Sequence, residues 1–87
     1  MTGSAAEADR RQADYFCNEL RRQIGLLDEE SQKIRTTLAD AERRGDRPHV
    51  YRSQHDLRAT ALEHAEVRHM LAALDRRFAA ESATTTR

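Results

Sequence analysis

The chain has 87 residues, with fifteen basic and fifteen acidic side chains, no net charge and a single cysteine. That length is enough for one small domain, and the balanced charge argues against nucleic acid as the main partner, because phosphate binding needs an excess of basic side chains. No apolar run approaches 18 residues, no signal-peptide pattern opens the chain and no second cysteine is present, so we expect a cytoplasmic protein without membrane contact or disulfide.

Residues from about 5 to 44 have the pattern of one long helix. Ser4 and Glu7 stand at the spacing of a capping box, so residues 1–3 before them are expected to be disordered. Small and apolar side chains then recur at alternating steps of four and three, which is the heptad pattern of a helix packed along one seam. These positions are Ala13, Cys17, Leu20, Ile24, Leu27, Ser31, Ile34, Leu38 and Ala41.

The helix is expected to end in a tight turn over residues 45–47. Gly45 suits the left-handed position that follows a helix, and Asp46 suits the N-cap of the next one. Arg43 and Arg44 place positive charge at the negative end of the first helix dipole. The chain therefore reverses its direction at this point.

A second long helix is predicted from about residue 47 to 81, with residues 82–87 disordered beyond it. Here too, small and apolar side chains recur at steps of three and four residues, in the opposite order to the first helix. Each position of the first stripe therefore has a counterpart on the second helix, related by reflection about the bond between Gly45 and Asp46. Two helices of equal length joined by a short turn must lie antiparallel. The second stripe is Val50, Ser53, Leu57, Thr60, His64, Val67, Leu71, Leu74 and Phe78. We therefore expect an all-α fold, a coiled-coil-like helical hairpin that forms a single domain over residues 1–87.

One layer of the predicted seam is polar. Ser31 stands opposite Thr60, and His64 lies one turn away, facing Leu27. A polar layer lowers stability, but it penalises shifted registers because a slipped polar group would face an apolar one. We therefore expect this layer to help set the register.

Several apolar residues are left outside the two stripes. On the second helix these residues form an additional apolar row, outside the seam, which Glu66 interrupts. The row is Ala59, Leu62, Met70 and Ala73. A lone hairpin buries only one seam, which gives marginal stability at this size. The wide apolar face therefore predicts a homodimer, in which two hairpins pair into a four-helix bundle.

No catalytic constellation is recognisable, neither a glycine-rich phosphate loop nor a Ser–His–Asp set. Cys17 falls on the seam, where a small buried hydrophobe is wanted. We therefore expect a non-enzymatic interaction or adaptor module without a cofactor, which engages a protein partner. The residues expected to contact that partner are Leu26, Leu62, Met70, Arg43, Arg44 and Arg47.

An alternative function rests on Glu66 and His69, which stand three apart on the second helix. Glu-x-x-His is the spacing at which one helix of a ferritin-like di-iron bundle supplies two ligands, to which a neighbouring helix adds a Glu. In this motif and in its hairpin shape the chain resembles the two-helix encapsulated ferritins, which assemble their metal site between subunits. The resemblance implies a site for iron or another divalent metal with Glu66, His69, Glu63 and Glu30 as ligands.

A further alternative uses the turn itself. Arg43, Arg44 and Arg47 form a basic tip, which Asp40 and Asp46 dilute. A projecting tip of this kind suits contact with nucleic acid or with the acidic patch of a protein. The alternative function is therefore that of a nucleic-acid-associated factor.

Overall fold

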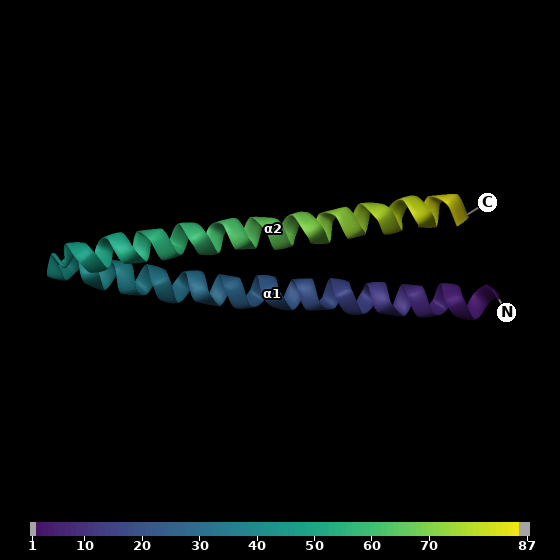
Figure 1. Ribbon diagram of the computed structural model, residues 1–87, viewed down its shortest axis with the longest axis horizontal. Coiled ribbons are helices and arrows are strands. Elements are labelled where there is room, and N and C mark those ends of the chain that lie inside the picture. Colours follow the sequence, from purple (N-terminus) through teal and green to yellow (C-terminus); the bar gives the residue numbers. More distant parts are fainter. Residues whose placement is uncertain (1, 86–87) are drawn as a thin grey trace.

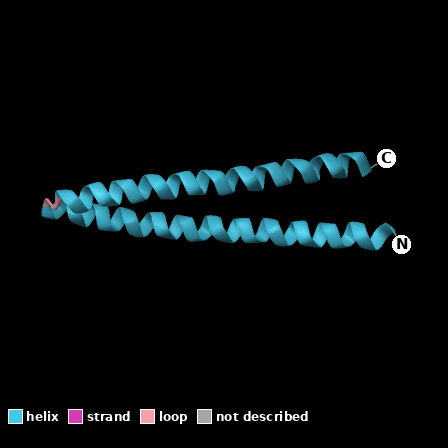
Figure 2. Ribbon diagram, in the orientation of Figure 1, coloured by secondary structure: helices cyan, strands magenta, loops and turns pink. Residues whose placement is uncertain are grey.

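The protein is a hairpin of two long helices that lie side by side (Figure 1). The computed structural model describes residues 2–85, and the side chains of residues 6–80. α1 spans Thr2–Arg44 and α2 spans Arg47–Thr85, and the described residues contain no strand (Figure 2). The molecule measures 66 × 18 × 13 Å, with the turn at one end and both termini at the other. The predicted all-α antiparallel hairpin is therefore confirmed.

Both helices extend further toward the termini than predicted. α1 begins at Thr2, so Ser4 lies inside the helix rather than at its cap, and α2 continues to Thr85 instead of ending near residue 81. Helix therefore replaces the disorder expected for residues 2–3 and 82–85, while residues 1, 86 and 87 lie outside the described part. The end segments are rich in alanine and contain no proline, and each residue added to an existing helix gains one backbone hydrogen bond.

The turn consists of Gly45 and Asp46, drawn in pink in Figure 2. Gly45 has a φ of 65°, the left-handed conformation that glycine adopts without steric cost. Its N–H donates to the carbonyl oxygen of Glu42 at 3.2 Å, and the N–H of Asp46 donates to that of Ala41 at 3.0 Å. These two bonds form a Schellman motif, which ends α1 as the sequence predicted.

The seam between α1 and α2 follows the two predicted stripes. All eighteen stripe positions are buried or partly buried, and among residues 6–80 only Glu19 and Asp46 join them. The predicted stripes are therefore confirmed as the seam. His64 of α2 lies 2.9 Å from Asp28 of α1, within one position of the mirror relation about the turn, so this contact agrees with the predicted register.

The seam is tightest near the turn. Ala41 is fully buried and Ser53 is 5% exposed, and these small side chains let the helix axes approach closely. Toward the termini the helices diverge (Figure 1), where the layers contain larger side chains such as Leu74 and Phe78. Both of these are partly buried, and Cys17 and Leu20 in the same half of the hairpin are 5% exposed, so burial in the seam continues toward the open end.

One seam leaves much of the chain in contact with solvent. The accessible surface is 7256 Å² for a mass of 10.0 kDa, whereas a compact monomer of that mass exposes about 5200 Å². The described core contains no large side chain that is fully buried. The hairpin therefore has a surface surplus of roughly 2000 Å², enough for further packing.

Gly45, just after α1, and Gly25, inside it, predict opposite responses to alanine. Gly45→Ala forces a Cβ into a left-handed conformation and should lower the free energy of unfolding by about 1–2 kcal/mol. Gly25 is the matched control, because it lies inside α1 and an added Cβ would meet nothing within 4 Å. Gly25→Ala should raise the free energy of unfolding by about 0.5–1 kcal/mol. Urea denaturation at one protein concentration measures both, and a neutral Gly45→Ala would contradict the turn geometry.

Candidate functional site

A groove lined by both helices lies midway along the hairpin. Leu27 and Val67 belong to the seam, so they form its apolar floor. Leu26 and Met70 are 52% and 48% exposed, so they present apolar surface to solvent beside it. The lining residues are Gln23, Leu26 and Leu27 of α1 and Glu63, Glu66, Val67 and Met70 of α2. We call the side of the hairpin that carries this groove the grooved face.

The structure brings together two of the three apolar residues predicted to contact a partner. Leu26 and Met70 line the same groove although they come from different helices. Leu62 does not line it and is 70% exposed. Leu62 and Met70 stand eight residues apart, which separates them by about 80–100° around the helix, so they belong to different sides of α2. Their roles in binding stay predictions.

The grooved face also gathers carboxylates. Glu63 and Glu66 line the groove, and Glu30, seven residues after Gln23, lies on the same side of α1. His69 is exposed and does not line the groove. Over the described part of a single chain, no group of three or more His, Cys, Asp or Glu side chains could hold a metal ion. The metal hypothesis therefore requires ligands from a second chain, as it did from the sequence.

The opposite side of the hairpin carries polar contacts across the seam. His64, with its side chain 22% exposed, places Nε2 at 2.9 Å from Oδ1 of Asp28, and Arg21 Nη2 lies 3.9 Å from Asp75 Oδ1. Neither contact was predicted from the sequence. The available signal was the heptad position, because Arg21, Asp28 and Asp75 each directly follow a seam residue. The groove residues that lie outside the seam each directly precede a seam residue. They therefore lie on the side of the hairpin opposite to Arg21, Asp28 and Asp75.

The polar layer makes a local bond rather than a bond across the seam. The hydroxyl of Thr60 donates to the carbonyl oxygen of Asp56, one turn earlier in the same helix, at 2.9 Å. This bond satisfies the hydroxyl donor inside α2, as threonine commonly does in helices. Thr60 therefore needs no donor or acceptor from α1.

Carboxylates compensate the arginines of the tip. Arg44 Nε donates to Asp40 Oδ2 at 3.0 Å, and Arg43 Nη2 lies 3.6 Å from Asp40 Oδ1. Arg44 Nη1 also lies 3.7 Å from Asp46 Oδ2. Arg47, the third arginine predicted to contact a partner, opens α2 and is exposed. The tip therefore presents mixed charge, with exposed arginines among the carboxylates.

Asp46 caps α2 and concentrates the electrostatics of the turn. The backbone N–H of His49 donates to Asp46 Oδ1 at 3.4 Å, and the ring Nδ1 of His49 lies 2.7 Å from Oδ2. Burial by itself would raise the pKa of the Asp46 carboxyl. The hydrogen bonds from His49, with the electrostatic attraction of His49 and Arg44, outweigh burial and hold this pKa below its ordinary value of 3.8.

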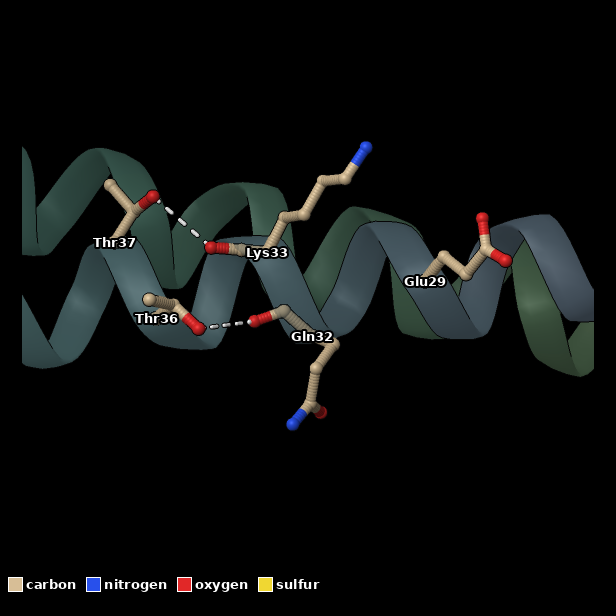
Figure 3. A pocket seen from close by; sticks show the side chains of 5 residues that line it. All are labelled: Glu29, Gln32, Lys33, Thr36 and Thr37. Atoms are coloured by element: carbon tan, nitrogen blue, oxygen red, sulfur yellow. Dashed lines mark hydrogen bonds between the residues drawn. The ribbon is translucent and has the colours of Figure 1, made fainter.

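A second depression lies on α1 alone (Figure 3). The hydroxyls of Thr36 and Thr37 donate to the carbonyl oxygens of Gln32 and Lys33 at 3.0 and 3.1 Å, so they are satisfied within the helix. The Glu29 carboxylate and the Lys33 ammonium extend away from the backbone without meeting each other (Figure 3). Because α2 supplies no opposing wall, the groove between the helices is the stronger candidate site.

Neither α1 nor α2, over their described lengths, contains a stretch apolar enough to cross a membrane. Comparison with protein-family models, with curated proteins and with solved structures finds no match to this chain. The function is therefore argued from the surfaces and contacts of the chain itself.

The lowered pKa of Asp46 predicts a specific acid sensitivity. The carboxylate contributes stability above the ordinary carboxyl pKa near 4, and this contribution is lost as the pH falls through the lower folded-state pKa. Asp46→Asn keeps a capping side chain and removes the charge. Between about pH 5 and 2, the Tm of the wild type should therefore fall further than that of Asp46→Asn, as measured by circular dichroism.

Asp46→Ala is the control for the cap itself. It removes both the charge and the hydrogen-bond acceptor, so its Tm at pH 7 should lie below those of the wild type and Asp46→Asn. Parallel acid profiles for the wild type and Asp46→Asn would show that the charge of Asp46 contributes nothing.

Proposed function

We propose that this chain is a non-enzymatic interaction module, a helical hairpin that self-associates into a dimeric four-helix bundle and offers its outer surface and tip to a protein partner. The observation that carries the proposal is the single seam, which leaves one apolar, grooved side of the hairpin uncovered. Packing a second layer of helices onto such a side is how bundles complete their cores.

The size of the exposed surface supports self-association. A standard interface buries about 800 Å² on each partner. The surface surplus of roughly 2000 Å² exceeds that area, so the hairpin could bury a full interface and still expose as much surface as a compact monomer. The exposed surface is therefore large enough for a dimer interface without any change in the fold of either helix.

Exposed apolar side chains support the same proposal. Six large apolar residues are between 48% and 70% exposed. Leu26 and Met70 line one groove, and apolar surface gathered in one place marks a contact site. The six are Tyr15, Phe16, Leu26, Tyr51, Leu62 and Met70.

The proposal includes a cytoplasmic location and a packing role for the cysteine. Cys17 is 5% exposed and lies in the seam with Leu20, where it acts as a small hydrophobe. A lone thiol buried in this way suits a reducing compartment, in which disulfides do not contribute to stability.

Self-association predicts a mass of twice 10.0 kDa in sedimentation equilibrium at micromolar concentration. By mass action, the Tm should also rise with protein concentration, because dilution favours the separated and less stable hairpins. A single species of 10.0 kDa, with a Tm independent of concentration, would overturn the proposal of a dimer.

Partner contact through the tip predicts a specific loss. A protein captured from a host lysate by the wild type and identified by mass spectrometry should bind the triple variant Arg43/Arg44/Arg47→Ala at least about tenfold more weakly in a purified titration. Arg10/Arg11→Ala is a charge-removing control, because both residues lie at the far end of α1. Equal losses in the two variants would show that the tip has no special role.

A further inference from the structure

We propose that two copies of this hairpin pair antiparallel across their grooved faces, with the two-fold axis passing beside Met70. This inference rests on the proposed self-association and adds the surface, the orientation and the register of the dimer. It follows from four observations: the groove, the residues that continue its face, the symmetry of those residues about one level, and their charges.

The grooved face continues beyond the groove. On helices packed along a heptad seam, residues seven apart lie on the same side, so the positions of Gln23, Leu26, Glu63 and Met70 can be extended along both helices. The residues added in this way include Asp9, Phe16, Glu30, Lys33 and Arg77.

This face carries the apolar surface that most needs a cover. Phe16, Leu26 and Met70 lie on it, and their side chains are 56%, 52% and 48% exposed. The other three exposed large apolar residues are 67–70% exposed, so they project further from the molecule and share no groove. The three residues of the grooved face are already partly packed against the hairpin and form a surface that a second helix layer can cover.

The apolar residues are symmetric about one level of the hairpin. The mirror relation of the seam pairs Leu20 with Leu71 and so places Arg21 of α1 at about the level of Met70 of α2. The groove that Gln23 and Met70 both line, and the contact of Asp28 with His64, agree with this register. At this level we place a two-fold axis that makes the two hairpins antiparallel. A residue a given number of positions before the axis in one chain then lies against the residue the same number of positions after it in the other chain. Phe16 lies five residues before Arg21, and Leu26 lies five residues after it. The axis therefore places Phe16 of each chain against Leu26 of the other chain, and it places the two Met70 side chains together.

The charged residues obey the same symmetry. Asp9 and Lys33 stand twelve residues on either side of Arg21, and Glu63 and Arg77 stand seven on either side of Met70. Both exchanges bring opposite charges together, and the symmetry makes each pair twice. Charge complementarity of this kind sets the orientation and register of an interface.

The parallel orientation brings like charges together. With both turns at the same end, α1 of one copy would face α2 of the other at equal levels, and Glu30 would face the partner's Glu63. The symmetry would then gather four glutamates at one level beside the groove. Like charges in contact disfavour an arrangement by several kcal/mol in general, so the antiparallel pairing is selected.

The other side of the hairpin is less suited to a second copy. It carries the His64–Asp28 contact at 2.9 Å and the Arg21–Asp75 contact at 3.9 Å, both of which already join the two helices. Covering these groups would remove them from water without adding a partner, which is costly for charges.

The position of the axis leaves both turns uncovered. Its level lies about 37 Å from the turn on helices of about 60 Å, so the overlap begins beyond the tip. By the same exchange, residues 2–40 and 55–85 overlap, and the turns with their arginines project from opposite ends of the bundle. The dimer therefore remains compatible with partner contact through the tip.

A pair of matched substitutions tests the surface. Met70→Glu places two carboxylates together on the axis, so the dissociation constant of the dimer should rise about a hundredfold or more, with the helix content unchanged because Met70 is half exposed. Leu62→Glu makes the same change on the other side of α2 and should leave the constant within about threefold. Sedimentation equilibrium measures both.

Cross-linking tests the orientation. Met70→Cys should form a disulfide-linked dimer under mild oxidation, because a disulfide requires Cβ atoms within about 4.5 Å, which only an axis beside this residue provides. Wild type, with Cys17 buried, is the control and should not cross-link. A parallel dimer would instead link Met70→Cys of one chain to Gln23→Cys of the other, which would overturn the proposal.

A charge exchange tests the register and does not depend on Met70. Lys33→Asp and Asp9→Lys should each weaken the dimer about threefold or more, and the double variant should restore the wild-type constant, because it re-forms the pair in reverse. Failure of the double variant to recover would overturn the register.

The outcomes separate this inference from the proposed function. A wild type that is monomeric at all concentrations overturns both. A wild-type dimer that survives Met70→Glu, or that does not link through Met70→Cys, overturns the antiparallel grooved-face pairing and leaves the proposal of self-association standing.

Discussion

The fold depends on two helices that have only each other to pack against. Each can bury one stripe, and the stripe must lie along a common seam for about 60 Å. The chain meets this constraint by mirroring its apolar positions about the bond between Gly45 and Asp46, so that every position of both stripes is at least partly buried. The same constraint leaves the outer surface of each helix to solvent or to a partner. The sparse core and the large accessible surface are therefore two aspects of one architecture.

The two sides beside the seam differ in chemistry, and this difference underlies the proposed function. One side holds contacts between the helices that involve His64 and Asp28, so its polar groups stabilise the hairpin itself. The other side exposes Leu26 and Met70 beside a row of carboxylates and makes a groove. Apolar surface with a charged border is typical of a contact that buries a centre and orients it with charge. A hairpin with one self-stabilised side and one open side is suited to pairing in layers.

The turn combines backbone geometry with charge. Gly45 ends α1, and the carboxylate of Asp46 begins α2, so the reversal needs only two residues. The arginines around it interact with Asp40 and Asp46, which keeps a cationic tip from repelling itself. The tip therefore contributes to the stability of the hairpin and also presents exposed guanidinium groups to the surroundings.

The sequence by itself determined the two helices, their turn and the register between them, because these follow from helical periodicity and from the glycine that permits the reversal. It did not place the helix ends, since alanine-rich segments lengthen a helix without any change of pattern. Only the tertiary structure brought Leu26 and Met70 into one groove, and only it joined His64 to Asp28. Spacing along one helix tells which residues share a side of that helix. Which side chains of two helices meet beside the seam depends on the rotation of each helix and the reach of each side chain, and these are settled when the helices pack.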